Sequence, residues 1–192
     1  MTNSTGQRDH FYQKLAPLYQ LKVEWNNRLR KEQKLFDLLF LDRTIDHVCD
    51  LGCGDGGHAE EITRRGAQYT GIDSSAAMIA MAKNLHSQLP NVNFQRGNAL
   101  GIPRKFDRAF DLVLLLGNTL PHFRSRQDLQ KLFAGISRVL QDNGRFVLQT
   151  VNPGLLESQD IHFLPSKLAE NTTLFTPFYV RRNQDWDFYM PI

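Results

Sequence analysis

A glycine-rich turn between a buried strand and an amphipathic stretch is the feature that most constrains this chain. His47–Leu51 has the pattern of a buried strand, and it ends in the glycine cluster Gly52–Gly57. A helix is predicted to follow from His58 to Arg65. Glycines at such a turn let backbone N–H groups approach a ligand closely. The turn therefore predicts a binding loop, and a tight turn without a ligand is the alternative.

Apolar runs and amphipathic stretches alternate along the next hundred residues. The further predicted strands are Tyr69–Asp73, Val92–Arg96, Phe110–Leu116 and Arg145–Thr150. Ser74 and Ser75 have the side chains that cap a helix, and Asp142-Asn143-Gly144 is predicted to stop a helix that carries Leu129 to Leu140. Alternation of this kind predicts an α/β fold, a Rossmann-like, doubly wound and mostly parallel sheet.

The two ends of the chain lie outside this alternation. Residues 10–45 are predicted to be helical, with an apolar stripe that covers the sheet or roofs a pocket. The stripe consists of Leu29, Leu35, Phe36, Leu38 and Leu39. After Pro153, Thr172–Val180 and Trp186–Met190 are predicted to form an antiparallel hairpin around residues 181–185. At 192 residues the chain fits one domain, with an N-terminal helical lid (1–45), a cofactor-binding core (46–153) and an acceptor-side insert (154–192).

The spacing of the glycines fits two classes of cofactor. Gly52, Gly54 and Gly57 satisfy the dinucleotide pattern G-x-G-x-x-G, whereas Gly52, Gly54 and Gly56 satisfy G-x-G-x-G. Asp73 ends the second strand, where a carboxylate accepts ribose hydroxyls in either class. The glycines and this acid alone do not decide between the classes.

The charges around the loop favour one of them. Asp50 and Asp55 bracket the glycines, and they would repel a pyrophosphate bound at the helix N-terminus. A ligand that carries an ammonium and a sulfonium but no phosphate matches two carboxylates better, and S-adenosylmethionine is such a ligand. Asp55 as a solvated loop residue is the alternative.

Two motifs resemble those of class I S-adenosylmethionine-dependent methyltransferases. Residues 48–56 resemble the first motif, and residues 71–75 followed by Met78 resemble the second. The resemblance covers residues 45–153 and implies the cofactor contacts. It implies that the methionyl group lies near Asp50, Gly52, Cys53 and Gly54, the ribose at Asp73, and the adenine between Ser74 and Met78. Packing in the core is the alternative role for Met78.

The resemblance extends to the third strand and to the lid. Gly97-Asn98-Ala99 stands where the family often has Gly-Asp-Ala, and an amide oxygen accepts the same hydrogen bond from the adenine amino group. Relatives of the glycine/sarcosine N-methyltransferase type have a lid whose tyrosine and arginine contact the cofactor carboxylate. Tyr19 and Arg28 stand at comparable positions here. Since Arg30 and Lys31 share the helix, a solvated face is the alternative for Arg28.

The acceptor is expected at the carboxyl ends of the fourth and fifth strands. Leu116-Gly117-Asn118 with the following His122 resembles the Leu-Gly-Asn-Ser stretch and histidine of the glycine/sarcosine type, and Asn152 resembles an asparagine on the acceptor side of those enzymes. With an ordinary pKa near ~6.5, His122 is the candidate general base. A structural histidine that hydrogen-bonds the loop is its alternative.

Together these residues predict an enzyme that transfers a methyl group from S-adenosylmethionine to a small-molecule N or O nucleophile by in-line displacement. An NAD-dependent oxidoreductase and a non-catalytic adenosyl-ligand-binding protein remain the alternatives. No metal site is expected, since the six histidines form no i, i+4 pair.

Composition narrows the partners and the setting. The net charge is +3, and the lysines and arginines are scattered among acidic residues, so neither a nucleic-acid partner nor a membrane is predicted. The two cysteines, Cys49 and Cys53, fit a reducing, cytoplasmic setting. The family resemblance implies a sheet of seven strands, of which five plus a hairpin are found here. We therefore expect a truncated chain that lacks the last core strands. The fifth strand would then have an exposed edge, through which a homo-oligomer could form.

Overall fold

A computed structural model describes residue 19, residues 23–117 and residues 119–150. Beyond them it describes the backbone of five short strands at residues 161–163, 167–168, 174–175, 178–182 and 185–189. Asn118, Asn152 and residues 1–18, about which the sequence made predictions, lie outside the described residues.

The central element is a five-stranded sheet in the order β3-β2-β1-β4-β5, in which every neighbouring pair is parallel. This confirms the predicted Rossmann-like α/β fold, and the strands appear in the predicted order along the chain. Their bounds are β1 His47–Leu51, β2 Gln68–Asp73, β3 Val92–Arg96, β4 Phe110–Leu115 and β5 Leu140–Leu148.

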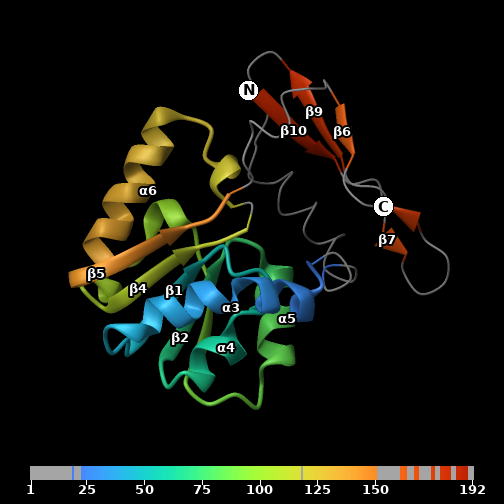
Figure 1. Cartoon of the computed structure of the whole chain (residues 1–192). Helices are drawn as coiled ribbons and strands as arrows, with labels where there is room; N and C mark the ends of the chain where they lie inside the picture. The colour runs from blue at the N-terminus through green and yellow to red at the C-terminus, as the bar shows by residue number, and fades with distance from the viewer. Residues whose placement is uncertain are drawn as a thin grey trace.

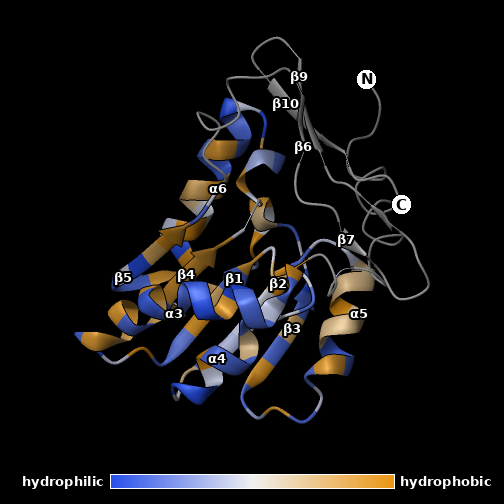
Figure 2. Cartoon of the chain, turned by 45° about the vertical axis from the view of Figure 1, so that its right-hand side comes forward, coloured by the Kyte–Doolittle hydropathy of each residue, from blue (hydrophilic) through white to orange (hydrophobic). Residues whose placement is uncertain are grey.

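Helices cover both faces of this sheet (Figure 1). Their bounds are α3 Trp25–Leu41, α4 Ala59–Arg64, α5 Ala76–Leu85 and α6 Arg126–Val139, with the short 3-10 helices η2 Ala99–Gly101, η3 Arg104–Phe106 and η4 Leu120–His122. One core cluster joins α3, α4 and α5 to one face, and another joins α6 to the opposite face. In Figure 2, α6 alternates hydrophobic and hydrophilic residues, as expected for a helix that packs on one side.

Strand periodicity explains how β1 serves both clusters. Val48 points to the cluster with α3 and α4, whereas Cys49 and Leu51 point to the cluster with α6. Asp50 lies on the same side as Val48, so the strand delivers one carboxylate to the face that α3 covers. Ser75 caps α5 by accepting a hydrogen bond from the Met78 N–H, which confirms a cap within the predicted Ser74-Ser75 pair.

Two local predictions are wrong. Asp142-Asn143-Gly144 does not stop α6, because the helix already ends at Val139, and Leu140 pairs with Phe110 as the start of β5. The three residues instead form an irregularity inside β5. In the predicted stripe of α3, Leu38 is 65% exposed, whereas Phe36 and Leu39 are buried.

The C-terminal strands belong to other sheets than the parallel one. β6 Ile161–Phe163, β9 Phe178–Arg182 and β10 Asp185–Tyr189 form a three-stranded antiparallel sheet, and β7 Lys167–Leu168 pairs with β8 Leu174–Phe175. The antiparallel hairpin of β9 and β10 confirms the prediction in outline. Thr172–Val180 is not one strand, since β8 and β9 lie in different sheets. Residues 181, 182 and 185, predicted as the turn, belong to the strands.

Among the described residues, no helix has the length and apolar character to cross a membrane.

Candidate functional site

The glycine loop turns sharply because three of its glycines adopt left-handed backbone conformations. Gly52, Gly54 and Gly56 have φ values of +72°, +58° and +79°, a region in which residues with a Cβ are strained. The loop is also closely covered. A Cβ on Gly52 would lie 2.6 Å from the Cγ2 of Thr119, so only glycine allows this approach. The loop therefore presents bare backbone to the residues that follow β4.

Asp73 joins the end of β2 to the glycine loop. Its carboxylate accepts hydrogen bonds from the backbone N–H of Gly54 at 3.0 Å and of Ser75 at 2.8 Å. These two bonds fix the carboxylate at the carboxyl edge of the sheet, as the sequence predicted for this acid.

Of the two residues predicted as lid contacts, Tyr19 lies over the glycine loop and Arg28 lies over the turn after β4. A Cβ on Gly54 would come within 2.6 Å of the Tyr19 hydroxyl, and one on Gly117 would lie 3.4 Å from Nη1 and Nη2 of Arg28. The Arg28 side chain is 21% exposed, so the solvated-face alternative is wrong. Its Nη2 is buried without a hydrogen-bond partner among the described residues.

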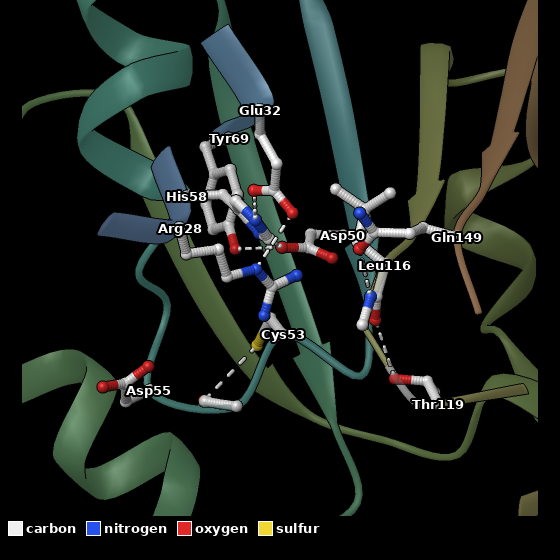
Figure 3. A network of polar contacts seen from close by, with 12 residues as sticks. Arg28, Glu32, Asp50, Cys53, Asp55, His58, Tyr69, Leu116, Thr119 and Gln149 are labelled. Atoms are coloured by element: carbon white, nitrogen blue, oxygen red, sulfur yellow. Dashed lines mark hydrogen bonds and ion pairs between the residues drawn. The ribbon is translucent and has the colours of Figure 1, made fainter. Parts of the chain in front are cut away.

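A buried chain of polar groups connects Arg28 to β1 (Figure 3). The Nε of Arg28 donates to Glu32 Oε1 at 3.0 Å, and the other oxygen of Glu32 lies 3.1 Å from Nε2 of His58. The Nδ1 of His58 lies 2.9 Å from Asp50 Oδ2, the oxygen to which the Tyr69 hydroxyl also donates at 2.9 Å. Asp50 Oδ1 receives no hydrogen bond from the described residues.

The network shifts several pKa values. Burial alone would lower the pKa of His58, but its hydrogen bonds to Asp50 and Glu32 raise it above the ordinary value. Burial likewise works against ionisation of Glu32, yet His58 and Arg28 hold its pKa below the usual range. Burial and the Asp50 charge raise the pKa of Tyr69 well above normal, so its hydroxyl stays protonated and donates.

Asp55 is not the solvated loop residue of the alternative prediction. It is 1% exposed, and its two carboxylate oxygens accept from the Trp25 indole Nε1 at 2.9 and 3.1 Å. Burial raises its pKa, which the indole hydrogen bond opposes. Trp25 also lies so close to Gly57 that a Cβ there would fall 2.0 Å from the Cε2 of the indole. Gly57, the third glycine of the G-x-G-x-x-G pattern, is thus covered by the Trp25 side chain of the lid helix.

The residues predicted to contact an adenine follow β2 and β3, with Met78 inside α5. Ser74 is exposed, and its carbonyl accepts from Arg96 Nε at 3.1 Å. Met78 is 1% exposed, as its core alternative requires. Gly97 leads into η2, where the exposed Asn98 accepts from Leu100 N–H at 2.9 Å and precedes Ala99. The Asn98 amide oxygen has a second lone pair for another donor.

The loop after β4 is shaped by two polar contacts. Thr119 Oγ1 donates to the carbonyl of the buried Leu116 at 3.2 Å, and the backbone N–H of Gly117 donates to the side-chain oxygen of Gln149 at 3.0 Å (Figure 3). His122 is partly buried in η4, and its backbone N–H donates to the Thr119 carbonyl at 3.1 Å. β4 and β5 thus place these residues at the same edge as Asp50 and Asp73.

Other reactive groups are few in the described part of the chain. Cys49 and Cys53 are free buried thiols, and burial raises the pKa of both, which disfavours the nucleophilic thiolate. No group of three or more histidine, cysteine or acidic residues there is arranged to hold a metal ion.

Sequence reasoning missed several residues at this edge, namely Trp25, Glu32, His58, Thr119 and Gln149. A sequence signal existed only for Glu32, an acid among the apolar positions of α3 that is 5% exposed in the fold. The others gain their contacts only through pairing between distant elements.

Comparison with known proteins gives one family match and several relatives. The family model described as "Methyltransferase domain" matches residues 48–144. A phthiotriol/phenolphthiotriol dimycocerosates methyltransferase of Mycobacterium tuberculosis is 36% identical over 110 residues, which cover 55% of this chain and 38% of that protein. A glycine/sarcosine N-methyltransferase of Parasynechococcus marenigrum is 25% identical over 154 residues, covering 78% and 55%. The chain thus spans about two fifths to just over half of these relatives.

A solved structure has the same fold. The crystal structure of the PH0226 protein from Pyrococcus horikoshii superposes with a TM-score of 0.62 at 24% identity, covering 88% of this chain and 76% of that one.

Proposed function

The chain belongs to the class I methyltransferase family, and we propose that it transfers a methyl group from S-adenosylmethionine to a small-molecule N or O acceptor. One observation carries the proposal beyond the family match. Among the described residues, the edge of the sheet combines a buried guanidinium nitrogen without a hydrogen-bond partner, on Arg28, with a carboxylate oxygen that receives no hydrogen bond, on Asp50. This pair suits the carboxylate and the ammonium of an amino acid.

The residues around the glycine loop fit this cofactor. The buried Nη2 of Arg28 has no hydrogen-bond partner in the part of the chain that the structure describes, and the cofactor carboxylate would supply one. Asp73 is held with its carboxylate at the loop, where ribose hydroxyls would donate to it. The full set of residues that we propose to contact the cofactor is Tyr19, Arg28, Asp50, Gly52, Cys53, Gly54, Asp73, Ser74, Met78, Gly97, Asn98, Ala99, Leu116 and Gly117.

The protein's own work in the reaction is mainly positioning. When bound, the cofactor supplies a methyl group on a sulfonium, which is already a good leaving group. The glycine loop and the lid helix α3 orient it and keep water away, and the acceptor must be held in line. We propose that His122 takes the proton of the acceptor, and that Asn118 and Asn152 bind the acceptor.

The alternatives have weaker support. The family match favours methyl transfer over hydride transfer. The acids at the loop also favour methyl transfer. Asp50 is buried beside the loop, and the Gly54 N–H donates to Asp73, so it is not available to bind a phosphate. A non-catalytic adenosyl-binding protein would keep the cofactor residues and lack the proton acceptor.

A transfer assay tests the proposal. The protein is incubated with S-adenosylmethionine labelled in the methyl group and with a panel of amines, carboxylates and phenols. We expect label in at least one acceptor, and an Asp73→Ala variant should lose ~1–3 kcal/mol of cofactor affinity, because two ribose donors lose a charged acceptor. Cofactor binding with no transfer across the panel would favour the non-catalytic alternative.

The proposal also covers the division of the chain into segments, its cellular location and its association with other copies. We divide the chain into a lid (1–45), a cofactor-binding core (46–153) and an acceptor-side insert (154–192). The two free thiols support a reducing, cytoplasmic setting. β5 ends the order of the parallel sheet, which supports association between copies at that edge, and sedimentation would measure it.

A further inference from the structure

His58 is a buried histidine with a carboxylate at each ring nitrogen. It precedes α4, directly after the glycine loop, and 3% of the residue is exposed. Its Nδ1 lies 2.9 Å from Asp50 Oδ2, and its Nε2 lies 3.1 Å from Glu32 Oε2. The edge of the Trp25 ring and the tilted Phe36 ring, with centroids at 4.9 and 5.8 Å, pack against the imidazole and exclude water.

The number of hydrogen bonds that His58 donates determines the charge of its imidazole. Ionised carboxylates only accept hydrogen bonds, and a neutral imidazole has one N–H to donate. Two hydrogen bonds from His58 to two carboxylates therefore require both ring nitrogens to carry a proton. The raised pKa of His58 and the lowered pKa of Glu32 agree with an imidazolium between two carboxylates.

The charges of the network balance only with that proton present. Arg28, Glu32, His58 and Asp50 then alternate in sign along the chain of contacts, and their sum is zero. Without the proton, two carboxylates would share one arginine in a buried site. Such an unbalanced charge is costly at low dielectric, and the contact between α3 and β1 would weaken.

The network links the two groups that we propose to bind the ends of an amino acid. Glu32 holds Arg28 through Nε, and Nη2 has no hydrogen-bond partner within the described ranges. On the other side, His58 and Tyr69 both occupy Oδ2 of Asp50, so Oδ1 faces no donor from the described residues. These contacts fix Nε of Arg28 and Oδ2 of Asp50, and Nη2 and Oδ1 are the atoms proposed to bind a ligand.

We propose that His58 is a positioning residue which, as a buried imidazolium, ties Glu32 of the lid helix to Asp50 of β1 and so holds Arg28 and Asp50 ready for the methionyl carboxylate and ammonium. This inference rests on the proposed function. The groups that face or bear on the imidazole are Glu32 and Arg28 from α3, Asp50 from β1, and Tyr69 from β2 through Asp50. Burial and the Asp50 charge keep the Tyr69 hydroxyl protonated, so loss of the His58 proton is the change expected as the pH rises through the raised pKa of His58.

The first test measures the protons directly. Nitrogen-15 NMR of the histidine rings in the full chain without cofactor, with the His58 ring assigned by through-bond correlation to its own backbone, reports whether each ring nitrogen is protonated. We expect both nitrogens of His58 to carry protons at pH 7. A ring with one unprotonated nitrogen at pH 7 would overturn the inference, whatever the protein does with a cofactor.

The second test measures the consequence, as the affinity for S-adenosylhomocysteine by calorimetry. His58→Asn removes the charge and the contact with Glu32, and we expect at least a tenfold loss of affinity. The Glu32→Gln/His58→Asn double variant restores charge balance with Arg28 and Asp50, and it should recover part of the loss. Affinity in wild-type protein should also fall as the pH rises through the His58 pKa, a trend that His58→Asn removes.

A matched control uses another histidine. His47 begins β1, and its side chain is 42% exposed, so His47→Asn should bind as the wild type does. Wild-type affinity in His58→Asn would overturn the inference while leaving the proposed function intact. Failure of the wild type to bind would instead contradict the proposed function. If His58→Asn does not fold, the NMR result on the wild type decides.

Discussion

Gly57→Ala tests whether the lid helix α3 lies directly on the glycine loop. An added Cβ would fall 2.0 Å from Cε2 and 2.1 Å from Cδ2 of the Trp25 indole, so the ring has to move. Overpacking of this kind costs about 1–3 kcal/mol. Moving the indole also breaks its hydrogen bonds to the buried Asp55 carboxylate, worth about 1.5–3 kcal/mol. We expect Gly57→Ala to lower the free energy of unfolding by about 2.5–6 kcal/mol.

Urea unfolding measures this loss, and a second glycine supplies the control. A Cβ on Gly101 would meet nothing within 4 Å, so Gly101→Ala should change stability by less than about 0.5 kcal/mol. In a Trp25→Ala background the obstacle is gone, and Gly57→Ala should then cost little more than Gly101→Ala. Equal losses for Gly57→Ala and Gly101→Ala in the wild-type background would refute the placement of Trp25 on the loop.

Three further predictions concern the buried network and the acceptor side. Tyr69→Phe removes a buried hydroxyl donor from Asp50 and should cost about 1–3 kcal/mol of stability in urea unfolding; no change would show that water replaces the donor. His122→Ala should lower turnover more than cofactor affinity, and equal losses of both would identify a structural histidine. The pKa of His58 is raised, so the stabilisation that its proton provides is complete below pH 6.5 and is lost as the pH rises through the raised pKa. The pKa of Glu32 is lowered, so the stabilisation from its charge is complete above pH 4.5 and is lost as the pH falls through the lowered pKa. Unfolding measured against pH should therefore show an alkaline decline that His58→Asn removes, and an unchanged decline in that variant would assign it to another group.

The sequence predicted the parallel sheet well because its signals are local. The strands at His47–Leu51 and Val92–Arg96 have the predicted bounds, and all six residues of β4 are buried, in keeping with an apolar run covered on both faces. Positions that need glycine are visible in the same way. The cluster after β1 predicted a turn, and three of its glycines have positive φ.

The errors arise where a local signal competes with pairing to a distant element. Asp142-Asn143-Gly144 resembles a helix stop, but Leu140 leaves the helix earlier because it pairs with Phe110. Leu38 lies about 100° around the helix from Leu39, on the side that turns away from the core, and it is exposed. Apolar character alone did not distinguish them.

The buried network lay beyond sequence reasoning for the same reason. His58 contacts Glu32, which is 26 positions away, and Asp50, which is 8 positions away. Neither spacing is a recognised motif, and only the packing of α3 against β1 and α4 brings the three together. The sequence predicted Arg28 through a family resemblance and Asp50 through its charge beside the glycines as well, without the residues that hold them.

This edge of the sheet is proposed to bind S-adenosylmethionine, and side-by-side calorimetry with two cofactors measures that binding. The full chain is titrated with S-adenosylhomocysteine and, in a separate run, with NAD. We predict saturable binding of one S-adenosylhomocysteine per chain, weakened in Asp73→Ala, and no binding of NAD. Tight NAD binding without any S-adenosylhomocysteine binding would contradict the account.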